Sequence, residues 1–327
     1  MNFRTVGSTG IHVSPLCFGT MSFGSEADQE TSAAMYRQVR ERGINFFDSA
    51  NVYGGGASEE ILGGLIAKER DDVVITSKVF FPTSGDVNAQ GLSRRHIIQA
   101  VEASLTRLDT DRIDFYFVHA FDENTPIETT LRALDDLQRD GKILHPAVSN
   151  WAAWQIATAL GISARESLAR FELIEPMYNL VKRQAEVEIL PLARAENLGV
   201  ITYSPLGGGL LTGKYRGGQQ PGGGRLVENA RYADRYGQES DHATADRFAS
   251  FADDAGTSPA ALAVAWAMAH PGVTAPIIGA RNLEQLEGSL AALDVDMTPE
   301  LRAEISALSP APAPATDRAE VLTGKWA

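Results

Sequence analysis

The sequence predicts an α/β fold, a single (β/α)₈ TIM barrel with an N-terminal β-hairpin and long loops at the C-terminal face. Eight short runs rich in β-branched and aromatic residues recur along the 327 residues, each is followed by a helical pattern, and no linker separates two halves. Most of the runs are continuously apolar, which is typical of parallel strands buried on both sides. We therefore expect one domain over residues 1–327, with residues 307–327 as a C-terminal tail.

The predicted elements begin with a hairpin from Phe3 to Val13, turning at Ser8-Thr9-Gly10, which could plug one end of the barrel. The eight strands are expected at Pro15–Gly19, Asn45–Asp48, Val73–Lys78, Ile113–His119, Ala147–Asn150, Phe171–Glu175, Val200–Tyr203 and Val273–Gly279. A long irregular, glycine-rich insertion, residues 205–242, follows the seventh strand. In a compact domain such a loop is usually a lid or a binding loop.

Helix starts carry recognisable signals between these strands. Thr125 and Glu128 form a capping box, with Pro126 at the first helical position. Ser93 is expected to open a second helix, and Ser258, followed by a proline, opens a third. These signals place helices after the third, fourth and seventh strands, as the barrel requires.

Composition excludes several classes of partner. Lys and Arg number 29 and Asp and Glu 42, so the net charge of −13 repels nucleic acid and anionic membranes. The longest apolar run, Ala260–Ala269, is shorter than the roughly 18 residues that cross a bilayer. Cys17 is the single cysteine, and Met1–Gly10 lacks the apolar core of a secretory signal. We expect a cytoplasmic protein with no nucleic-acid or membrane partner; the oligomeric state is not specified.

Polar residues stand at the ends of three consecutive strands. The second strand ends in Asp48, with Tyr53 five residues later, the third in Lys78 and the fourth in His119. Barrel enzymes carry their reactive groups at the C-terminal ends of the strands, and adjacent strands lie about 5 Å apart. We therefore expect these four side chains to cluster on one rim.

The four residue types predict chemistry on a carbonyl. A free tyrosine has a pKa of about 10, and an ammonium group beside it, here Lys78, should lower the pKa of Tyr53 by stabilising the phenolate. Asp48 would keep Lys78 charged, and His119 would donate a hydrogen bond to an oxygen that becomes negative. Taken singly, Asp48 also fits a turn cap and Lys78 a solvated strand end, but their shared rim favours a catalytic role.

Several motifs resemble the signature of the aldo-keto reductases. The resemblance is carried by NFFDSANVYG at 45–54 and SEEILG at 58–63, and by the segments 76–78, 117–119, 148–150, 203–206 and 278–281. It runs in order from Val6 to about Leu293 and implies an NADP(H)-dependent oxidoreductase that passes a hydride from NADPH to an aldehyde or ketone, giving an alcohol. In that family's scheme Tyr53 is the general acid, with Lys78, Asp48 and His119 completing a catalytic tetrad.

The resemblance also implies an NADP(H) site, with NADPH preferred over NADH and no metal. The nicotinamide end would be formed by Gly19, Thr20, Met21, Asp48, Ser149, Asn150, Glu175 and Tyr203. The pyrophosphate and adenosine end would be formed by Ser204, Leu206, Lys214, Gly279, Arg281, Gln285 and Ser289. Arg281 can pair with a 2′-phosphate better than a lysine could.

Glu175 departs from the family pattern, because many members carry a glutamine there that helps to fix the nicotinamide amide. A carboxylate accepts hydrogen bonds but cannot donate them. If Glu175 is ionised, it should favour the positively charged oxidised ring over the neutral reduced one.

Substrate contacts are expected from aromatic residues beside strand ends. The candidates for an apolar wall are Phe23, Phe80, Phe81 and Trp151, although aromatics at such positions also serve loop packing. After His119 stands Ala120, where some relatives carry a tryptophan, so the pocket should differ in shape. The physiological substrate is not specified by the sequence.

Other function classes remain as alternatives. A Schiff-base lyase could use Lys78, although a close Asp48 opposes the neutral amine that this chemistry needs. A regulatory protein could hold NADP(H) with little turnover. Residues 208–214 read G-x-x-x-x-G-K, but Tyr215 replaces the Ser or Thr of a phosphate loop. A metal-dependent hydrolase is weakest, because the six histidines lack ligand spacing beside a strand-end acid.

Overall fold

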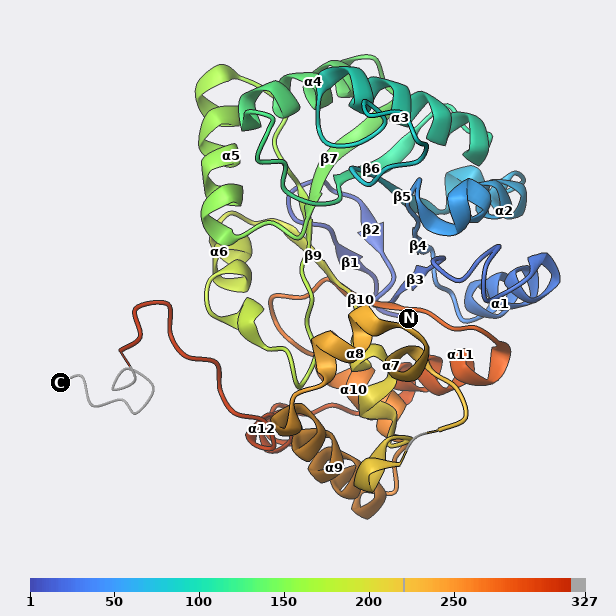
Figure 1. The fold of residues 1–327 in the computed structure, drawn as a ribbon, viewed down its shortest axis with the longest axis vertical. Helices are drawn as coiled ribbons and strands as arrows, with labels where there is room; N and C mark the ends of the chain where they lie inside the picture. The colour runs from blue at the N-terminus through green and yellow to red at the C-terminus, as the bar shows by residue number, and fades with distance from the viewer. Residues whose placement is uncertain (220, 319–327) are drawn as a thin grey trace.

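The computed structural model describes residues 1–219 and 221–318. Within these residues, eight parallel strands close into a barrel in the order β10-β3-β4-β5-β6-β7-β8-β9, with helices around it (Figure 1). The strands are β3 (Cys17–Gly19), β4 (Phe46–Asp48), β5 (Val74–Val79), β6 (Ile113–Val118), β7 (Ile143–Ser149), β8 (Leu173–Glu175), β9 (Gly199–Thr202) and β10 (Ala275–Ile278). The predicted (β/α)₈ fold class is confirmed.

Helices cover the outside of the barrel. Those before the insertion are α1 (Gln29–Glu41), α2 (Ala57–Ile66), α3 (Arg94–Leu108), α4 (Ile127–Arg139), α5 (Ala153–Glu166) and α6 (Ile189–Ala195). The later ones are α7 (Arg225–Glu228), α8 (Ala230–Tyr236), α9 (Glu239–Asp254), α10 (Pro259–Met268), α11 (Leu283–Leu290) and α12 (Pro299–Ala307). In the described chain, none of these helices is long and apolar enough to span a membrane.

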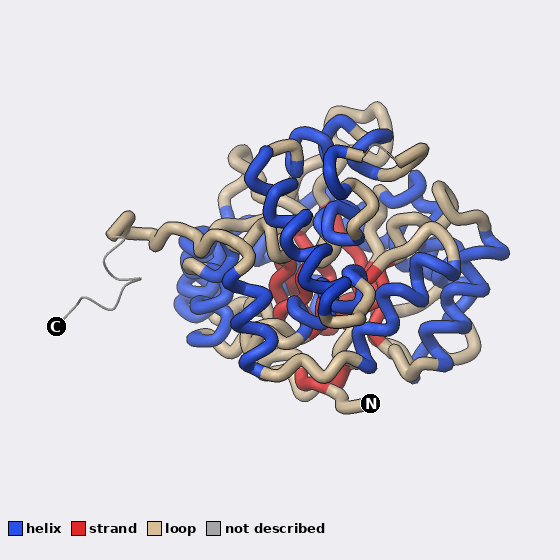
Figure 2. The backbone as a smooth tube through the Cα atoms, turned by 90° about the horizontal axis from the view of Figure 1, so that it is seen from below, coloured by secondary structure: helices blue, strands red, loops and turns tan. Residues whose placement is uncertain are grey.

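The N-terminal hairpin closes one end of the barrel, as predicted. Strands β1 (Arg4–Thr5) and β2 (His12–Val13) pair antiparallel. Val6 and Val13 are fully buried and belong to the same apolar cluster as Phe46 and Phe115, whose side chains fill the barrel. Figure 2 shows this hairpin below the barrel strands, beside the N-terminus. The opposite, C-terminal end of the strands is therefore the end at which a site can open.

Two of the predicted helix starts are confirmed and the capping box is wrong. Ser93 caps α3 by accepting a hydrogen bond from the backbone N–H of His96, and α10 begins directly after Ser258. In α4 the cap position is Pro126, and no side-chain hydrogen bond caps this helix within the described chain. The Thr125 hydroxyl instead donates to Asp122 at 2.8 Å, because a carboxylate is the stronger acceptor.

The insertion of residues 205–242 is more helical than the sequence suggested. It contains the 3₁₀ helix Gly207–Thr212, then α7 and α8, and α9 begins within it. Leu210 and Leu211 pack into the core and so attach this glycine-rich segment to the barrel. Residue 220 of this insertion, and residues 319–327 of the expected tail, lie outside the described residues, and the single domain remains a prediction.

Candidate active site

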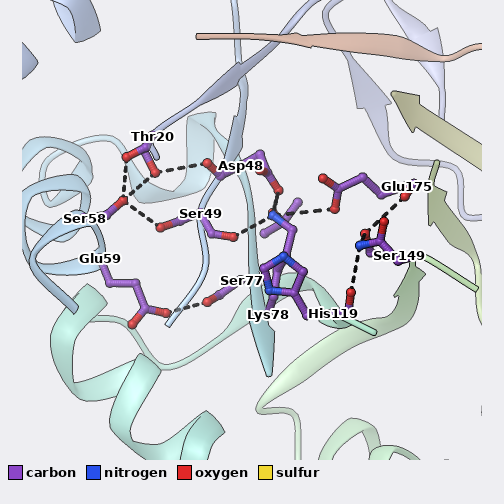
Figure 3. A network of polar contacts seen from close by, with 12 residues as sticks. Thr20, Asp48, Ser49, Ser58, Glu59, Ser77, Lys78, His119, Ser149 and Glu175 are labelled. Carbon is purple, nitrogen blue, oxygen red and sulfur yellow. Dashed lines mark hydrogen bonds and ion pairs between the residues drawn. The ribbon is translucent and has the colours of Figure 1, made fainter. Parts of the chain in front are cut away.

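Side-chain alternation along the strands builds the site. Successive residues of a strand point to opposite faces, and Cys17, Phe46, Phe115 and Leu173 fill the barrel interior. With the same alternation, the inward positions closest to the C-terminal ends are Gly19, Asp48, Lys78, His119, Ser149, Glu175, Tyr203 and Gly279. Figure 3 shows Asp48, Lys78, His119 and Glu175 converging in this layer. The predicted rim is thus the inward face of the strand ends.

Lys78 is fully buried and lies at the centre of this layer. Its Nζ forms an ion pair with Asp48, donates to the backbone oxygen of Ser49 at 2.9 Å and lies 3.6 Å from Glu175 Oε2. Asp48 Oδ1 also accepts a hydrogen bond of 2.6 Å from Thr76. Burial favours a neutral amine, but Asp48 and Glu175 outweigh it, so the pKa of Lys78 lies above its ordinary value. Lys78 is a charged ammonium.

Tyr53 faces this ammonium from the 3₁₀ helix Tyr53–Gly56. The turn needs positive φ values, for example 56° at Gly54, which glycine adopts without strain. Lys78 Nζ lies 5.3 Å from the centre of the Tyr53 ring. The ring of His119 meets the ring of Tyr53 edge-on, with 6.1 Å between centres. The four predicted catalytic residues therefore lie together.

The phenol of Tyr53 is neutral in this structure. Burial raises its pKa above the ordinary value, and the Lys78 ammonium opposes this only in part, because Asp48 and Glu175 add negative charge nearby. The expectation that Lys78 lowers the pKa of Tyr53 was wrong in its net direction. A neutral phenol keeps a proton available at neutral pH.

His119 is also neutral. Burial, and to a lesser extent the Lys78 ammonium, lower its pKa to about 3. Its Nδ1 is buried and has no hydrogen-bond partner among the described residues. A neutral imidazole has one N–H donor, so His119 can donate to an oxygen in the pocket without adding charge to it.

Glu175 is buried beside Lys78. Burial raises its pKa to about 8, with Lys78 opposing and Asp48 reinforcing this shift. Within the described residues its Oε2 has no hydrogen-bond partner. Below that pH the side chain is a neutral carboxylic acid with one O–H donor, whereas the ionised form only accepts hydrogen bonds.

Ser149, Asn150 and Tyr203 form a connected group beside Glu175. The Ser149 hydroxyl donates to the backbone oxygen of Glu175 at 3.1 Å. The Asn150 amide donates to the backbone oxygen of His119 at 2.9 Å and accepts from the Tyr203 hydroxyl at 2.8 Å. Asn150 has a φ of 59°, a left-handed conformation that asparagine tolerates better than most residues. This group places amide and hydroxyl groups at the C-terminal ends of the strands.

The residues expected from the first strand end differ in position. A Cβ on Gly19 would lie 2.7 Å from the Ile277 side chain, so the close packing of β3 and β10 requires glycine there. The Thr20 side chain is fully buried, where its hydroxyl donates to the backbone oxygen of Asp48 at 3.0 Å. Thr20 therefore supports the strand end from behind, whereas Met21 is partly exposed at the rim.

A second charged group lies at the expected adenosine end. Arg281 pairs with Glu228 of α7 at 2.8 Å and with Glu26 of the first loop at 3.2 Å, and its backbone N–H donates to Gln285 at 3.1 Å. Burial and the nearby Arg281 lower the pKa of Lys214. Sequence reasoning missed both carboxylates, because they come from the first loop and from α7 of the insertion, and neither carries a recognisable motif.

The remaining predicted cofactor positions are mixed in exposure. Ser289 of α11 is buried, which separates its side chain from the open surface. Gly279 is exposed at the end of β10, and Leu206 is partly buried. Ser204 has a φ of 57°, and its backbone oxygen accepts a hydrogen bond from Asn179 at 2.9 Å. Asn179 thus holds the start of the insertion.

The aromatic residues predicted to line the substrate site do not all lie there. The Phe81 ring meets the His119 ring edge-on at 4.9 Å and the Phe80 ring at 5.2 Å, so both phenylalanines flank the site. Phe23 is fully buried against Phe18, at 5.8 Å, because the first loop folds back over the outer core. The placement of Phe23 in an open wall was wrong.

Trp151 lines a cavity that borders the site. It is buried, with its ring 5.0 Å from Phe121 and 5.5 Å from Phe171. It lines a cavity of about 280 Å³ whose other walls include Val148 and Ile174. These two residues alternate with the inward Ser149 and Glu175 and so face the helix side of the barrel wall, but the cavity is also lined by Asn150 and Glu175 of the site.

The residues present fit a nicotinamide dinucleotide. Glu175 Oε2 is a buried polar atom that lacks a hydrogen-bond partner in the described chain, and Glu175 lines the same cavity as the exposed Asn150, which suits a carboxamide group. Lys214 and Arg281 supply two cations at the other end, where phosphates would lie. The polar groups at one end suit the nicotinamide amide, and the two cations at the other end suit the phosphates of the same ligand.

Known proteins are similar to this chain over most of its length. The profile of the aldo/keto reductase family matches residues 15–310. The chain is 34% identical over 330 residues to the "Uncharacterized oxidoreductase YrpG" of Bacillus subtilis, covering 98% of this chain and 99% of that protein. It is 37% identical over 302 residues to a probable voltage-gated potassium channel subunit beta of Arabidopsis thaliana, covering 90% and 92%. It is 32% identical over 331 residues to versiconal hemiacetal acetate reductase of Aspergillus parasiticus, covering 92% and 94%.

Proposed function

Because this chain belongs to the aldo/keto reductase family, we propose that it reduces the carbonyl of an aldehyde or ketone to an alcohol with NADPH, Tyr53 acting as the general acid. Members of the family are oxidoreductases that generally use NADP(H) and act on small carbonyl compounds. We further propose that the protein prefers NADPH to NADH, that it is a carbonyl reductase and that it is cytoplasmic.

The roles of the side chains follow from their charges. When bound, NADPH supplies the hydride that forms the new C–H bond. Tyr53 gives its proton to the carbonyl oxygen, and the Lys78 ammonium, 5.3 Å from the Tyr53 ring centre, stabilises the phenolate that remains. Asp48 holds Lys78 charged and in place. The neutral His119 ring donates a hydrogen bond to the same carbonyl oxygen, which fixes the orientation of the substrate.

One observation carries the proposal. A fully buried ammonium, Lys78, is paired with Asp48 and faces a phenol that is still protonated. A buried ion pair is a poor means of stabilising a fold, because desolvation offsets most of the Coulomb attraction. Its position under Tyr53, at the open end of the barrel, supports a chemical role.

The test is NADPH oxidation with a panel of aldehydes and ketones. We expect Tyr53→Phe to bind NADPH nearly as well as the wild type and to reduce carbonyls about 10²–10⁴-fold more slowly, the usual contribution of general acid catalysis. Tyr36→Phe serves as the control, because the Tyr36 hydroxyl bonds Glu69 on the helix side, away from the pocket. Equal reduction rates for Tyr53→Phe and the wild type would refute the role of Tyr53.

A second candidate is a regulatory protein that binds NADP(H) with little turnover. The similarity to proteins named as potassium channel subunits favours it. The same assay separates the candidates: tight NADPH binding without oxidation of NADPH by any carbonyl of the panel would support the regulatory function. A Schiff-base lyase is disfavoured by the raised pKa of Lys78, and failure of borohydride to trap an adduct would exclude it.

A further inference from the structure

Lys78 is placed between two carboxylates, and they are not equivalent. Asp48 pairs with Lys78 directly and also accepts a hydrogen bond from Thr76. Glu175 approaches from β8, on another side of the barrel, and its Oε2 lies 3.6 Å from Lys78 Nζ (Figure 3). That oxygen is buried and makes no hydrogen bond to any described residue. Asp48 is satisfied within the protein, and Glu175 is not.

The charges around Glu175 leave one carboxylate in excess. The titratable groups that face it come from several elements and are Lys78 on β5, Asp48 on β4, Cys17 on β3, Tyr53 on the 3₁₀ helix and Tyr203 after β9. Tyr53 is neutral, and burial keeps Cys17 and Tyr203 protonated by raising their pKa values. One ammonium therefore serves two carboxyl groups, and the Asp48 carboxylate already neutralises it. An ionised Glu175 would be a buried negative charge without its own counter-ion.

Resting on the proposed function, we propose that Glu175 determines which oxidation state of the nicotinamide ring this protein binds more tightly. Its neutral acid form suits the neutral ring of NADPH. Its carboxylate form supplies the unbalanced negative charge that attracts the cationic ring of NADP⁺. Glu175 is thus a specificity-determining residue, and the pH selects between its two forms.

The sign of the pH effect follows from linkage. A cationic ring beside Glu175 lowers the pKa of its carboxyl group, so NADP⁺ binding releases a proton and strengthens as the pH rises. A neutral ring lacks this attraction. Since burial raises the pKa of Glu175 to about 8, the ratio of the NADP⁺ to the NADPH dissociation constant should fall as the pH increases toward and through that value. Each unit of pKa difference between the two complexes changes the ratio tenfold.

The experiment measures both dissociation constants between about pH 6 and pH 10, a range that spans the expected change. The proteins are the wild type, Glu175→Gln, and Glu172→Gln as a matched control. Glu172 lies three residues earlier, where its side chain accepts a hydrogen bond from Ser8 at 3.0 Å. The 2′-phosphate titrates in both nucleotides, so its effect cancels in the ratio.

We expect about a tenfold or larger fall of the ratio in the wild type and in Glu172→Gln, and a flat ratio in Glu175→Gln. Infrared difference spectra of the free wild type and Glu175→Gln should also show a protonated carboxyl band that disappears at high pH. A ratio in Glu175→Gln that follows the wild type would overturn the inference while leaving the proposed function intact. Failure of both nucleotides to bind the wild type would overturn both.

Discussion

Two regions of the site share one arrangement, a cation facing two carboxyl groups, but one is buried and the other is exposed. Lys78 lies between Asp48 and Glu175 on strand ends, and all three are buried. Arg281 lies between Glu228 of α7 and Glu26 of the first loop, where the three side chains are 26%, 49% and 36% exposed. The first cluster is fixed by the barrel, and the second depends on how the insertion lies over it.

The two clusters differ in how easily their ion pairs can be broken and replaced. A buried ion pair is costly to break, because either partner left alone is an unpaired charge in the protein interior. An exposed pair contributes little, because water and salt replace it readily. The Lys78 cluster is therefore suited to holding charges in place during a reaction, whereas Arg281 can release its carboxylates in favour of a phosphate.

The largest expected effect is that of Lys78→Met on stability. The variant leaves Asp48 buried without its counter-ion, so we expect a loss of about 3–5 kcal/mol in the free energy of unfolding at neutral pH. Urea denaturation measures it. Lys142→Met is the control, because the Lys142–Glu102 pair is 32% and 51% exposed and should contribute less than about 1 kcal/mol. Equal losses in both variants would contradict the contrast between the buried and exposed clusters.

The second effect concerns the exposed cluster and NADPH. Arg281→Ala should weaken NADPH binding about 10–100-fold, since hydrogen bonds to charged groups contribute about 1.5–3 kcal/mol. NADH lacks the 2′-phosphate, so its affinity should change little, and the discrimination between the two nucleotides should narrow. Fluorescence titration measures both affinities.

Arg42→Ala is the matched control for this prediction. Arg42 is 32% exposed and also faces two carboxylates, Glu287 and Asp294, so it resembles Arg281 in exposure and pairing. Its removal should leave both nucleotide affinities unchanged. Parallel losses of NADPH and NADH affinity in Arg281→Ala would place the 2′-phosphate elsewhere.

The sequence predicts the buried cluster better than the exposed one, for a physical reason. Strand periodicity fixes which residues point inward, so the order of residues along the chain is enough to place Asp48, Lys78 and His119 on one rim. Loops have no such period. Glu26 of the first loop and Glu228 of the short helix α7 lie far apart in the chain, and no motif signals that they meet at Arg281.

The net effect of burial on a pKa could not be predicted from the sequence either. The direction of the Tyr53 pKa depends on whether burial outweighs the Lys78 ammonium, and only the surrounding packing decides that balance. Phe23 and Phe81 illustrate the same limit. Both are aromatics shortly after strand ends, yet Phe23 folds back onto Phe18 and Phe81 meets His119. A side chain's surroundings beyond a strand end are set by tertiary contacts.

The smallest expected effect is a change in NADPH affinity when one of the two carboxylates that pair with Arg281 is neutralised. In Glu228→Gln the guanidinium loses one competing carboxylate, and a negative charge near the phosphates disappears, so NADPH should bind about 2–5-fold more tightly. The gain should shrink at high salt, because an exposed charge is screened. Titration of NADPH at low and high ionic strength measures it, with Glu287→Gln as a control of 56% exposure. Weaker binding in Glu228→Gln would mean that the Glu228–Arg281 pair instead holds α7 in the position that the nucleotide requires.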